Sequence, residues 1–327
     1  AYFDSIIRWQ ERRNGVTGLT KECIGYENGV LGGVSSFIEA YSLPGDWLLL
    51  NDTCYTGFQS TVANRGRNIV YSPVKETADG WALDIEDMEK KIIEKKPPIM
   101  IFCNPHNPTG HVWTKEEMIA VVELCDKYGM LILSDEIWAD FQTGGHKHVP
   151  LHTCCPRAKE IVYSMYAPSK TFNLAGLQAS TTIFPNLRMK ADFDRYWSSM
   201  DIHRNNAFSS VAIEAAYREG REWLDQLLPY LSANFDFVKE YCEKNIPQIK
   251  PNIPDATYLV WLDCRDLGMS NEELRKFMIE KAKIGLDEGY TFGRSLTGFM
   301  RLNVACPRSV LEKALGQLKD AVDALDK

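Results

Sequence analysis

The stretch PPIMIFCNPHNPTGHVWTKEEMIAVVELCDKYGMLILSDE, at residues 97–136, decides the fold. Its two apolar runs, PPIMIFC and MLIL, are short and indicate buried β-strands. The segment between them, at 114–129, has helical spacing, with Thr114 and Glu117 placed as a capping box and Gly129 as the C-terminal stop. A strand, a helix and another strand in this order are typical of a sheet whose parallel strands are covered by helices.

The same alternation continues on both sides of this stretch, from about residue 20 to about residue 185. Near-continuous apolar runs indicate strands that are buried on both faces, which favours a mostly parallel sheet between two layers of helices. Asp84 is a candidate N-cap for one of these helices. The expected strands lie at 45–52, 68–74 and 160–166, and the expected helices lie at 55–66 and 83–96.

The pattern changes after about residue 205. A long helical pattern at 209–245 contains Pro229, which we expect to kink or divide the helix because proline lacks a backbone donor. The later segments predict a smaller C-terminal α/β domain. We therefore divide the chain into a large domain, residues 1–208, and a linking helix with the small domain, residues 209–327. The expected strands of the small domain lie at 256–264 and 298–306, and its expected helices lie at 271–282 and 309–327.

The bulk composition is that of a globular protein. The 327 residues are 45% hydrophobic and 25% charged, with a formal net charge of -7. No basic run stands out and no apolar stretch approaches the ~18 residues of a membrane span, so we expect neither nucleic acid nor membrane as a partner.

Nine scattered cysteines without a C-x-x-C pair indicate reduced thiols and a cytoplasmic location. The first residue is Ala1 and a helical pattern already fills 1–14, so we expect that an N-terminal segment is missing.

Polar side chains end three of the apolar runs, at the edge where open α/β sheets bind ligands. Asn107 lies in the loop NPHNPTG, Asp135 lies in SDEIWAD, and Lys170 lies in APSKTFNLAGLQ. Burial lowers the pKa of a lysine and so supplies the neutral amine that Schiff-base chemistry needs; the alternative is a surface lysine with a partly covered stem. Taken alone, Asp135 fits a structural role, as a helix N-cap or in a core salt bridge, as well as it fits a functional one.

In order and approximate spacing, these three motifs resemble those of the fold-type I pyridoxal-phosphate (PLP) enzymes, the aspartate aminotransferase superfamily. The resemblance covers essentially the whole chain. It implies a large PLP-binding domain with a mostly parallel, seven-stranded-type sheet sandwiched by helices, and a smaller C-terminal α/β domain. It also implies that Lys170 holds PLP as a Schiff base and acts in catalysis, that Asp135 pairs with the pyridinium nitrogen, and that Asn107 donates to the ring oxygen.

The resemblance implies further contacts with the cofactor and the substrate. Tyr55, in CYTGF, matches an aromatic residue that stacks on the ring and takes part in catalysis; a core tyrosine is the alternative. Val30 and Leu31, in GVLG, match the loop whose amides bind the phosphate at a helix N-terminus. Ser169 adds a hydroxyl to the phosphate. Arg301, in MRLNVACPR, matches the arginine that clamps the substrate α-carboxylate, with a structural ion pair as the alternative.

Three positions depart from the family pattern. Ala167 stands where a phosphate-binding serine is common, and Gln178 stands near where many relatives have a phosphate-binding arginine. We therefore expect a phosphate site with less charge that relies more on backbone amides. Trp138 occupies a position that aminotransferases often fill with tyrosine, and its indole N–H replaces the hydroxyl as a donor to the cofactor. This departure favours a lyase over a transaminase.

The stretches DGWALDIEDME, HNPTGHVWTKEEM, ATYLVWLDCRDL, GYTFG and GFMRLNVACPRS are similar to the cystathionine β-lyase-like C–S lyase branch, of the MalY/PatB type. This similarity implies α,β-elimination of cystathionine, cysteine or related S-substituted L-amino acids to pyruvate, ammonia and a thiol. A class I/II aminotransferase, which transfers an amino group to a 2-keto acid with the same lysine, is the main alternative. A PLP-fold transcription regulator or regulator-binding protein is a third. The family also implies a homodimer with shared active sites.

Three histidines, His146, His148 and His152, cluster in the segment TGGHKHVPLHT. Histidine is a common metal ligand, but this segment offers no supporting carboxylate or cysteine geometry. We therefore predict a polar surface loop here and no metal site.

Overall fold

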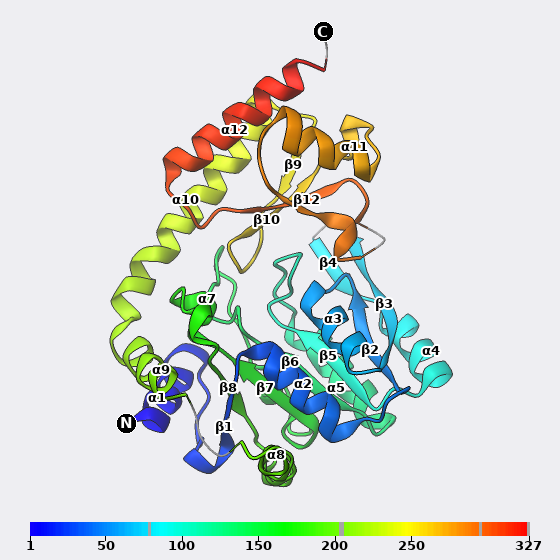
Figure 1. Cartoon of the computed structure of the whole chain (residues 1–327), viewed down its shortest axis with the longest axis vertical. Coiled ribbons are helices and arrows are strands. Elements are labelled where there is room, and N and C mark those ends of the chain that lie inside the picture. The colour runs from blue at the N-terminus through cyan, green and yellow to red at the C-terminus, as the bar shows by residue number, and fades with distance from the viewer. Residues whose placement is uncertain (78–79, 203–205, 294–295, 326–327) are drawn as a thin grey trace.

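Two β-sheets organise the chain, and helix α10 (Arg221–Asn245) runs between the parts that carry them (Figure 1). The computed structural model describes residues 1–77, 80–202, 206–293 and 296–325. The larger sheet has eight strands in the order β1-β8-β7-β6-β5-β2-β3-β4, and the smaller has four in the order β11-β12-β10-β9. In the view of Figure 1 the smaller sheet lies above the larger one.

The larger sheet is mostly parallel, as the sequence predicts. Its five central strands, from β7 to β3, are parallel neighbours, whereas β8, β1 and β4 each pair antiparallel with a neighbour. The short β4 forms a hairpin with β3 and is the eighth strand beyond the seven-stranded type. The strands are β1 (Ile24–Glu27), β2 (Trp47–Asp52), β3 (Asn68–Thr77), β4 (Gly80–Leu83), β5 (Ile99–Cys103), β6 (Leu131–Asp135), β7 (Val162–Tyr166) and β8 (Ser180–Ile183).

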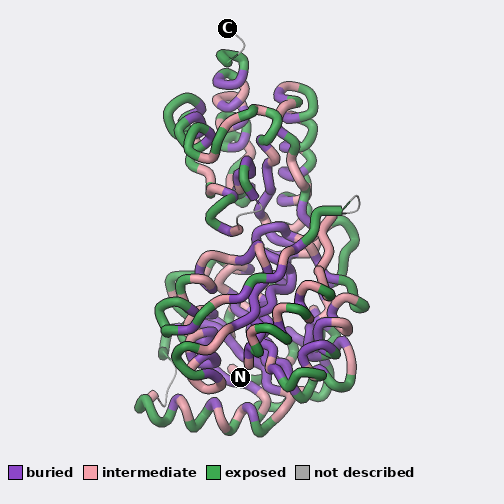
Figure 2. Tube along the Cα trace, turned by 90° about the vertical axis from the view of Figure 1, so that its right-hand side faces the viewer, coloured by how far each residue is buried: buried purple, intermediate pink, exposed green. Residues whose placement is uncertain are grey.

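Helices cover both faces of this sheet. Alternate residues of a strand point to opposite sides, so each face presents apolar side chains that a layer of helices buries. In β2, Leu48 and Leu50 pack into one core, and Leu49 packs into the other. Figure 2 shows the buried chain running through the middle of this part of the molecule. The first core is covered by α1 (Tyr2–Asn14), α2 (Val30–Tyr41), α3 (Thr56–Asn64), α8 (Leu187–Ser199) and α9 (Ala207–Glu219), and the second by α4 (Ile85–Lys95), α5 (Lys115–Lys127) and α6 (Ala158–Ile161).

Two helix starts have the caps that the sequence predicts. Thr114 Oγ1 accepts from the amide of Glu117 at 3.2 Å, and the Thr114 amide donates to Glu117 Oε2 at 2.9 Å, which completes the capping box of α5. Asp84 Oδ1 accepts from the amide of Asp87 at 3.1 Å at the start of α4. Such caps pair amides that have no partner within the first helical turn.

The smaller sheet is antiparallel throughout. Its core also contains residues of α10 and of the C-terminal helix α12 (Arg308–Asp323). Pro229 does not divide the long helix: α10 continues through this proline, and the break falls at Gly220 instead, while a kink at Pro229 stays a prediction. A Cβ on Gly220 would lie 2.4 Å from the Phe172 ring, so close packing favours glycine there. The strands are β9 (Lys250–Asn252), β10 (Leu259–Asp263), β11 (Asp287–Glu288) and β12 (Phe299–Asn303).

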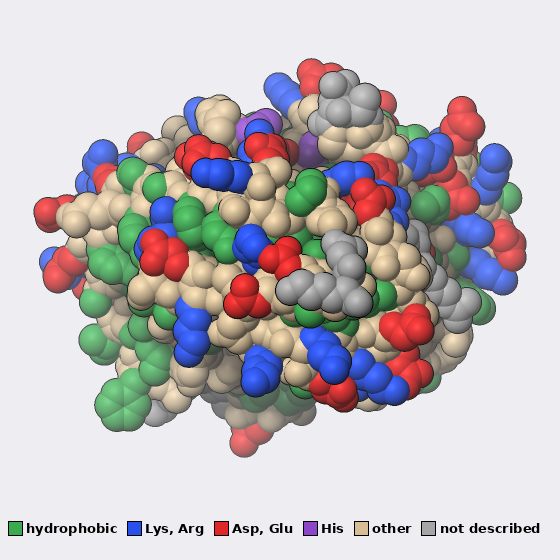
Figure 3. Space-filling view, turned by 90° about the horizontal axis from the view of Figure 1, so that it is seen from above, with side chains coloured by type: hydrophobic (Ala, Val, Ile, Leu, Met, Phe, Trp, Pro, Cys, Tyr) green, Lys and Arg blue, Asp and Glu red, His purple; other side chains and the backbone are tan. Residues whose placement is uncertain are grey.

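Short helical segments complete the described chain. In its described part, no helix is both long and apolar enough to cross a membrane. Basic and acidic side chains are interspersed over the face shown in Figure 3. The short segments are η1 (Lys21–Cys23), η2 (Leu151–Thr153), α7 (Pro168–Thr171), η3 (Ala175–Leu177), η4 (Arg265–Leu267), α11 (Asn271–Lys276), η5 (Phe277–Lys281) and η6 (Gly289–Thr291).

The two sheets have separate hydrophobic cores. One of the two cores of the larger sheet includes Ile213 and Leu224, and the core of the smaller sheet includes Leu231 and the buried apolar residues that follow it in α10. Helix α9 and the first turns of α10 therefore pack with the larger sheet. The domain division at residues 208 and 209 stays a prediction.

Candidate active site

A cavity of about 350 Å³ opens beside the carboxyl ends of the parallel strands, where the two sheets face each other. Open α/β sheets bind ligands at this edge. All the predicted site residues line this one cavity, although they come from both parts of the chain. These residues are Val30, Leu31, Tyr55, Asn107, Asp135, Trp138, Ser169, Lys170 and Arg301.

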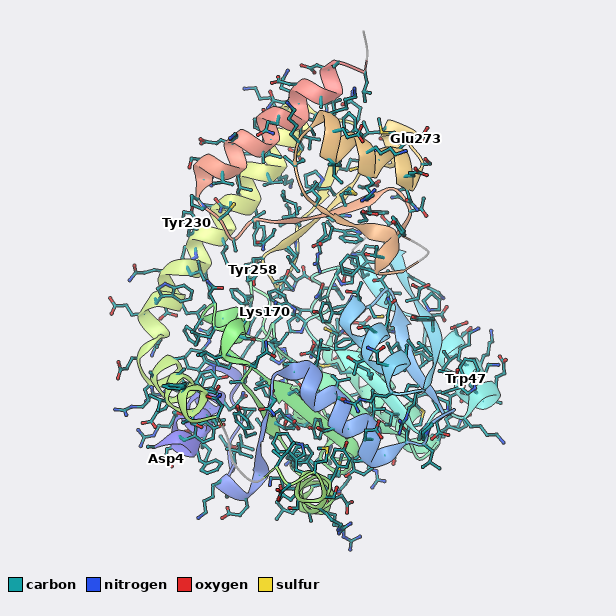
Figure 4. The ribbon with its side chains drawn as sticks, viewed as in Figure 1. Asp4, Trp47, Lys170, Tyr230, Tyr258 and Glu273 are labelled. Atoms are coloured by element: carbon teal, nitrogen blue, oxygen red, sulfur yellow. The ribbon has the colours of Figure 1, made fainter. Side chains whose placement is uncertain are left out.

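Lys170 lies in α7, the short helix that follows β7. Burial lowers the pKa of Lys170, the positive charge of Arg301 lowers it further, and the negative charge of Asp135 opposes both. Its Nζ lies 5.6 Å from the centroid of the Trp138 ring. Figure 4 places Lys170 on the side of the larger sheet, and Tyr258, the residue before β10, lies above it in this view. The lysine is thus held in a cavity that favours the neutral, nucleophilic amine.

Asp135 is the last residue of β6 and is 4% exposed. Burial raises its pKa to about 7, although its Oδ1 accepts from the amide of Ile137 at 3.1 Å. The charge of Glu136 raises the pKa further, and Lys170 opposes this. A buried carboxyl in a cavity wall is costly to ionise unless a cation approaches it. Asp135 is therefore suited to a ligand that brings a protonated nitrogen.

Glu136 lies beneath the cavity and is fully buried. Burial acts to raise its pKa, but the hydrogen bond and charge of His148, the charge of His152 and the hydrogen bond of Tyr166 together outweigh that effect, and the pKa is lowered. His148 Nε2 lies 2.7 Å from Oε2, and the hydroxyl of Tyr166 donates to the same oxygen at 2.5 Å. These bonds hold the chain that follows Asp135 in place.

The prediction of a polar surface loop around His148 and His152 is wrong. Both are buried, at 1% and 2% exposure, and His152 Nδ1 lies 3.0 Å from Oγ of Ser164. The reason is that Glu136, which lies 12 positions before His148 and outside the segment with the three histidines, supplies the carboxylate that His148 contacts. Only His146 of the three is exposed in the described chain, and Asp255 pairs with it at 3.2 Å. Across the described residues, His, Cys, Asp and Glu form no group that could hold a metal ion.

A turn at Gly29 leads into α2 at one end of the cavity. Gly29 has a φ of 74°, which favours glycine, and a Cβ there would lie 3.1 Å from Oε1 of Gln178. The amides of Val30 and Leu31 begin the helix, so they lack partners within its first turn. Ser169 joins them in the cavity lining. This end suits an anionic group bound by amides and a hydroxyl.

Arg301 reaches the cavity from β12. Its Nη1 donates to Oδ1 of Asn107 at 2.8 Å, and its Nη2 donates to Oδ2 of Asp287 at 2.6 Å. Sequence reasoning missed Asp287 and two further lining residues, Tyr258 and Asn303. The strand that carries Asp287 has two residues, too few for an alternating pattern to be recognised.

The donors and acceptors around this cavity fit PLP. Lys170 offers an amine for the aldehyde, Asp135 a carboxyl group for the ring nitrogen, and Asn107 an amide for the ring oxygen. The backbone amides after Gly29 suit the phosphate. Tyr55 supplies an aromatic face, and Gly57 leaves room for it, because a Cβ on Gly57 would lie 2.4 Å from the Tyr55 ring. A mostly parallel sheet with this set of groups at its carboxyl edge defines the class of fold-type I PLP enzymes.

Comparisons with known proteins agree with this class. The family model for aminotransferase class I and II matches residues 4–318, and the chain belongs to this family. Cystathionine beta-lyase PatB of Bacillus subtilis (strain 168) is 37% identical over 319 residues, which cover 98% of this chain and 82% of PatB. Protein MalY of Escherichia coli (strain K12) is 30% identical over 328 residues, which cover 99% of this chain and 82% of MalY.

A solved structure with the same fold is also similar to this chain. Cystalysin from Treponema denticola, whose crystal structure contains a pyridoxal 5'-phosphate cofactor, matches with a TM-score of 0.95 and 30% sequence identity. The match covers 99% of this chain and 82% of the cystalysin chain.

Proposed function

We propose that this chain is a PLP-dependent carbon–sulfur β-lyase. Its substrates are cystathionine, cysteine or related S-substituted L-amino acids, and its products are a thiol, pyruvate and ammonia. The observation that carries the proposal is the meeting of Lys170, Asp135 and Arg301 at one cavity, in a chain similar over almost its whole length to a cystathionine β-lyase. One water is consumed, because the three-carbon fragment that leaves after the Cβ–S bond breaks is hydrolysed to pyruvate and ammonia.

Lys170 acts twice in this proposal. Its Nζ would hold PLP through the aldehyde of the cofactor, and the same amine, when free, would take the proton from the substrate Cα. Burial and the charge of Arg301 both lower the pKa of this amine, which favours the form that accepts a proton. Bound PLP supplies a pyridine ring that takes up the electron pair left at Cα. Asp135 keeps the ring nitrogen protonated, since the carboxylate is stabilised when that cation is close.

The remaining residues orient the reactants. Arg301 holds the α-carboxylate with its planar fork, and Asn107 donates to the ring oxygen. Tyr55 covers one face of the ring. Val30, Leu31 and Ser169 bind the phosphate through backbone amides and a hydroxyl, and Trp138 contacts the cofactor beside Lys170. Trp138 has no hydroxyl with which to serve a transaminase as tyrosine does, and this favours elimination.

We further propose a cytoplasmic homodimer with shared active sites. Phe208 and Val211 of α9 are 79% and 70% exposed, and such apolar side chains favour a contact with another subunit. All nine cysteines are free thiols, which suits a reducing compartment. We also propose the domain division between residues 208 and 209.

An aminotransferase is the second candidate function. The description of the matching family favours it, because that family is named for transamination. Transamination needs the same lysine, the same carboxylate and the same arginine. The two reactions differ in whether the Cβ–S bond breaks or a proton is returned to the cofactor.

The experiment that tests the proposed function mixes the PLP-loaded protein with L-cystathionine, with and without a 2-keto acid. Thiol and pyruvate are measured together. We expect both products in equal amounts without the keto acid and no product from the Lys170→Ala variant. Product formation that strictly requires the keto acid contradicts the lyase and favours the aminotransferase.

A further inference from the structure

The contacts of Arg301 single out Asp287, which has no role in the function proposed above. Asp287 opens β11 and is the register partner of Arg301 on β12, so the two residues form a cross-strand pair. Both line the cavity that contains Lys170. Their ion pair is therefore part of the cavity wall and not a remote surface contact.

Three neighbours hold the Arg301 guanidinium. Its Nε and Nη2 both donate to Oδ2 of Asp287, at 3.1 and 2.6 Å, and its Nη1 donates to Oδ1 of Asn107 at 2.8 Å. The centroid of the Phe292 ring lies 4.4 Å from Cζ. A guanidinium has five N–H groups, so these bonds leave one N–H on Nη1 and one on Nη2. Each terminal nitrogen thus keeps a donor, and a carboxylate can bind the end of a planar fork between these nitrogens with two parallel hydrogen bonds.

We infer that Asp287 is a positioning residue that fixes the Arg301 fork for the substrate α-carboxylate. The inference rests on the proposed function, because it assumes that Arg301 binds this carboxylate. A free arginine side chain samples many rotamers and loses this freedom on binding a ligand. A fork that is already fixed loses less, so it binds a carboxylate more tightly.

Repulsion between Asp287 and the incoming carboxylate acts in the opposite direction. The side chain of Asp287 is 58% exposed, whereas that of Arg301 is 13% exposed. Water and salt screen the repulsion from an exposed carboxylate. The two hydrogen bonds that orient the guanidinium persist under the same conditions. Orientation therefore outweighs repulsion, and loss of Asp287 weakens the binding of carboxylates.

The test uses 3-(methylthio)propanoate, which has the carboxylate and thioether of a substrate but no amine to react with the cofactor. Its primary amide is the uncharged reference. Calorimetry on the PLP-loaded protein gives a dissociation constant for each compound, and their ratio reports the carboxylate contact. We expect Asp287→Ala to weaken binding of the carboxylate ~5–10-fold and to leave binding of the amide unchanged. Asp287→Asn keeps an acceptor oxygen, and we expect a change within ~3-fold.

Two further variants separate the possible failures. Asp266→Ala removes a carboxylate that is about as exposed as Asp287, pairs with Lys250 and lies outside the cavity lining, and we expect both dissociation constants to stay unchanged. Arg301→Ala removes the fork itself. If Arg301→Ala keeps the preference for the carboxylate, the role proposed for Arg301 is wrong. If Arg301→Ala loses that preference while Asp287→Ala binds the carboxylate as tightly as the unmodified protein or more tightly, the inference about Asp287 alone is overturned.

Discussion

Arg301 donates from Nη1 to Oδ1 of Asn107 over 2.8 Å, and this hydrogen bond joins the smaller sheet to the loop that follows β5. The two residues are 194 positions apart in the sequence. In the proposed function Asn107 holds the ring oxygen of the cofactor and Arg301 holds the α-carboxylate of the substrate. One hydrogen bond thus connects the cofactor side of the cavity with its substrate side.

Replacing Asn107 tests this connection. Asn107→Ala removes both the amide donor to the ring oxygen and the acceptor for Arg301. We expect kcat/KM for L-cystathionine to fall ~10–100-fold, because two charge-assisted contacts are lost. Asn68→Ala is the matched control, since this exposed asparagine bonds only the backbone of Gly45 among the described hydrogen bonds of its side chain. Equal kcat/KM values for the two variants would argue against the role of Asn107.

Asp135 gives a prediction about pH. Its pKa of about 7 in the folded protein is above that of an unfolded aspartate, so the native state binds the proton more tightly. Stability of the cofactor-free protein therefore falls as pH rises from ~4 through ~7. Asp135→Asn has no such titration and is expected to be more stable than the unmodified protein by ~2–4 kcal/mol at pH 8, but not at pH 4.

Urea unfolding of both cofactor-free proteins at the two pH values measures this effect. A stability difference that does not change with pH would contradict the burial argument. When PLP is bound, the same substitution is expected to weaken the cofactor complex, because the ring nitrogen loses its carboxylate.

The buried pair of Glu136 and His148 predicts a large loss of stability. His148→Leu leaves the Glu136 carboxylate buried without the imidazole that contacts it at 2.7 Å, at a cost of ~3–5 kcal/mol. The control is Lys127→Ala, which removes an exposed pair with Glu89 and is expected to cost less than ~1 kcal/mol. Chemical denaturation measures both. Similar losses for the two variants would show that the buried pair contributes no more than a surface pair.

Gly110 predicts a steric effect on the loop that carries Asn107. Its φ is 73°, and a Cβ there would lie 2.2 Å from Cβ of Pro254 and 2.9 Å from the carbonyl oxygen of Ala256. Gly129 has a φ of 69°, and a Cβ there would have nothing within 4 Å. Gly129→Ala therefore measures the cost of placing a side chain on a backbone with positive φ, without a steric clash. We expect Gly110→Ala to destabilise the protein by ~1–3 kcal/mol more than Gly129→Ala, and to lower kcat/KM as well. Equal effects of the two substitutions would contradict this account.

The sequence predicted much of this cavity because its main residues follow strong local signals. Asn107, Asp135 and Lys170 each come directly after an apolar run, and parallel strands bring such ends together. Tyr258 and Asp287 were missed because nothing near them in the sequence indicates the cavity. Their place depends on how the smaller sheet faces the larger one.

Other errors have different causes. The burial of His148 depends on Glu136, which lies across a turn and is held by Tyr166 of another strand. Pro229 lies within α10, so the general rule that proline divides helices gave the wrong boundary. Strands β1 and β8 were not recognised in the sequence, because each has four residues, too few for a pattern of apolar residues to indicate a strand.

The central claim is that Lys170 carries the cofactor, and borohydride labelling tests it most directly. Borohydride reduces the C=N bond that joins a lysine amine to PLP. The resulting C–N single bond is permanent. After digestion, mass spectrometry locates the modified lysine. We predict that the peptide containing Lys170 carries the pyridoxyl group and that the Lys170→Ala protein is unlabelled. A label on another lysine, or an unlabelled Lys170 in protein that was loaded with PLP, would contradict the account.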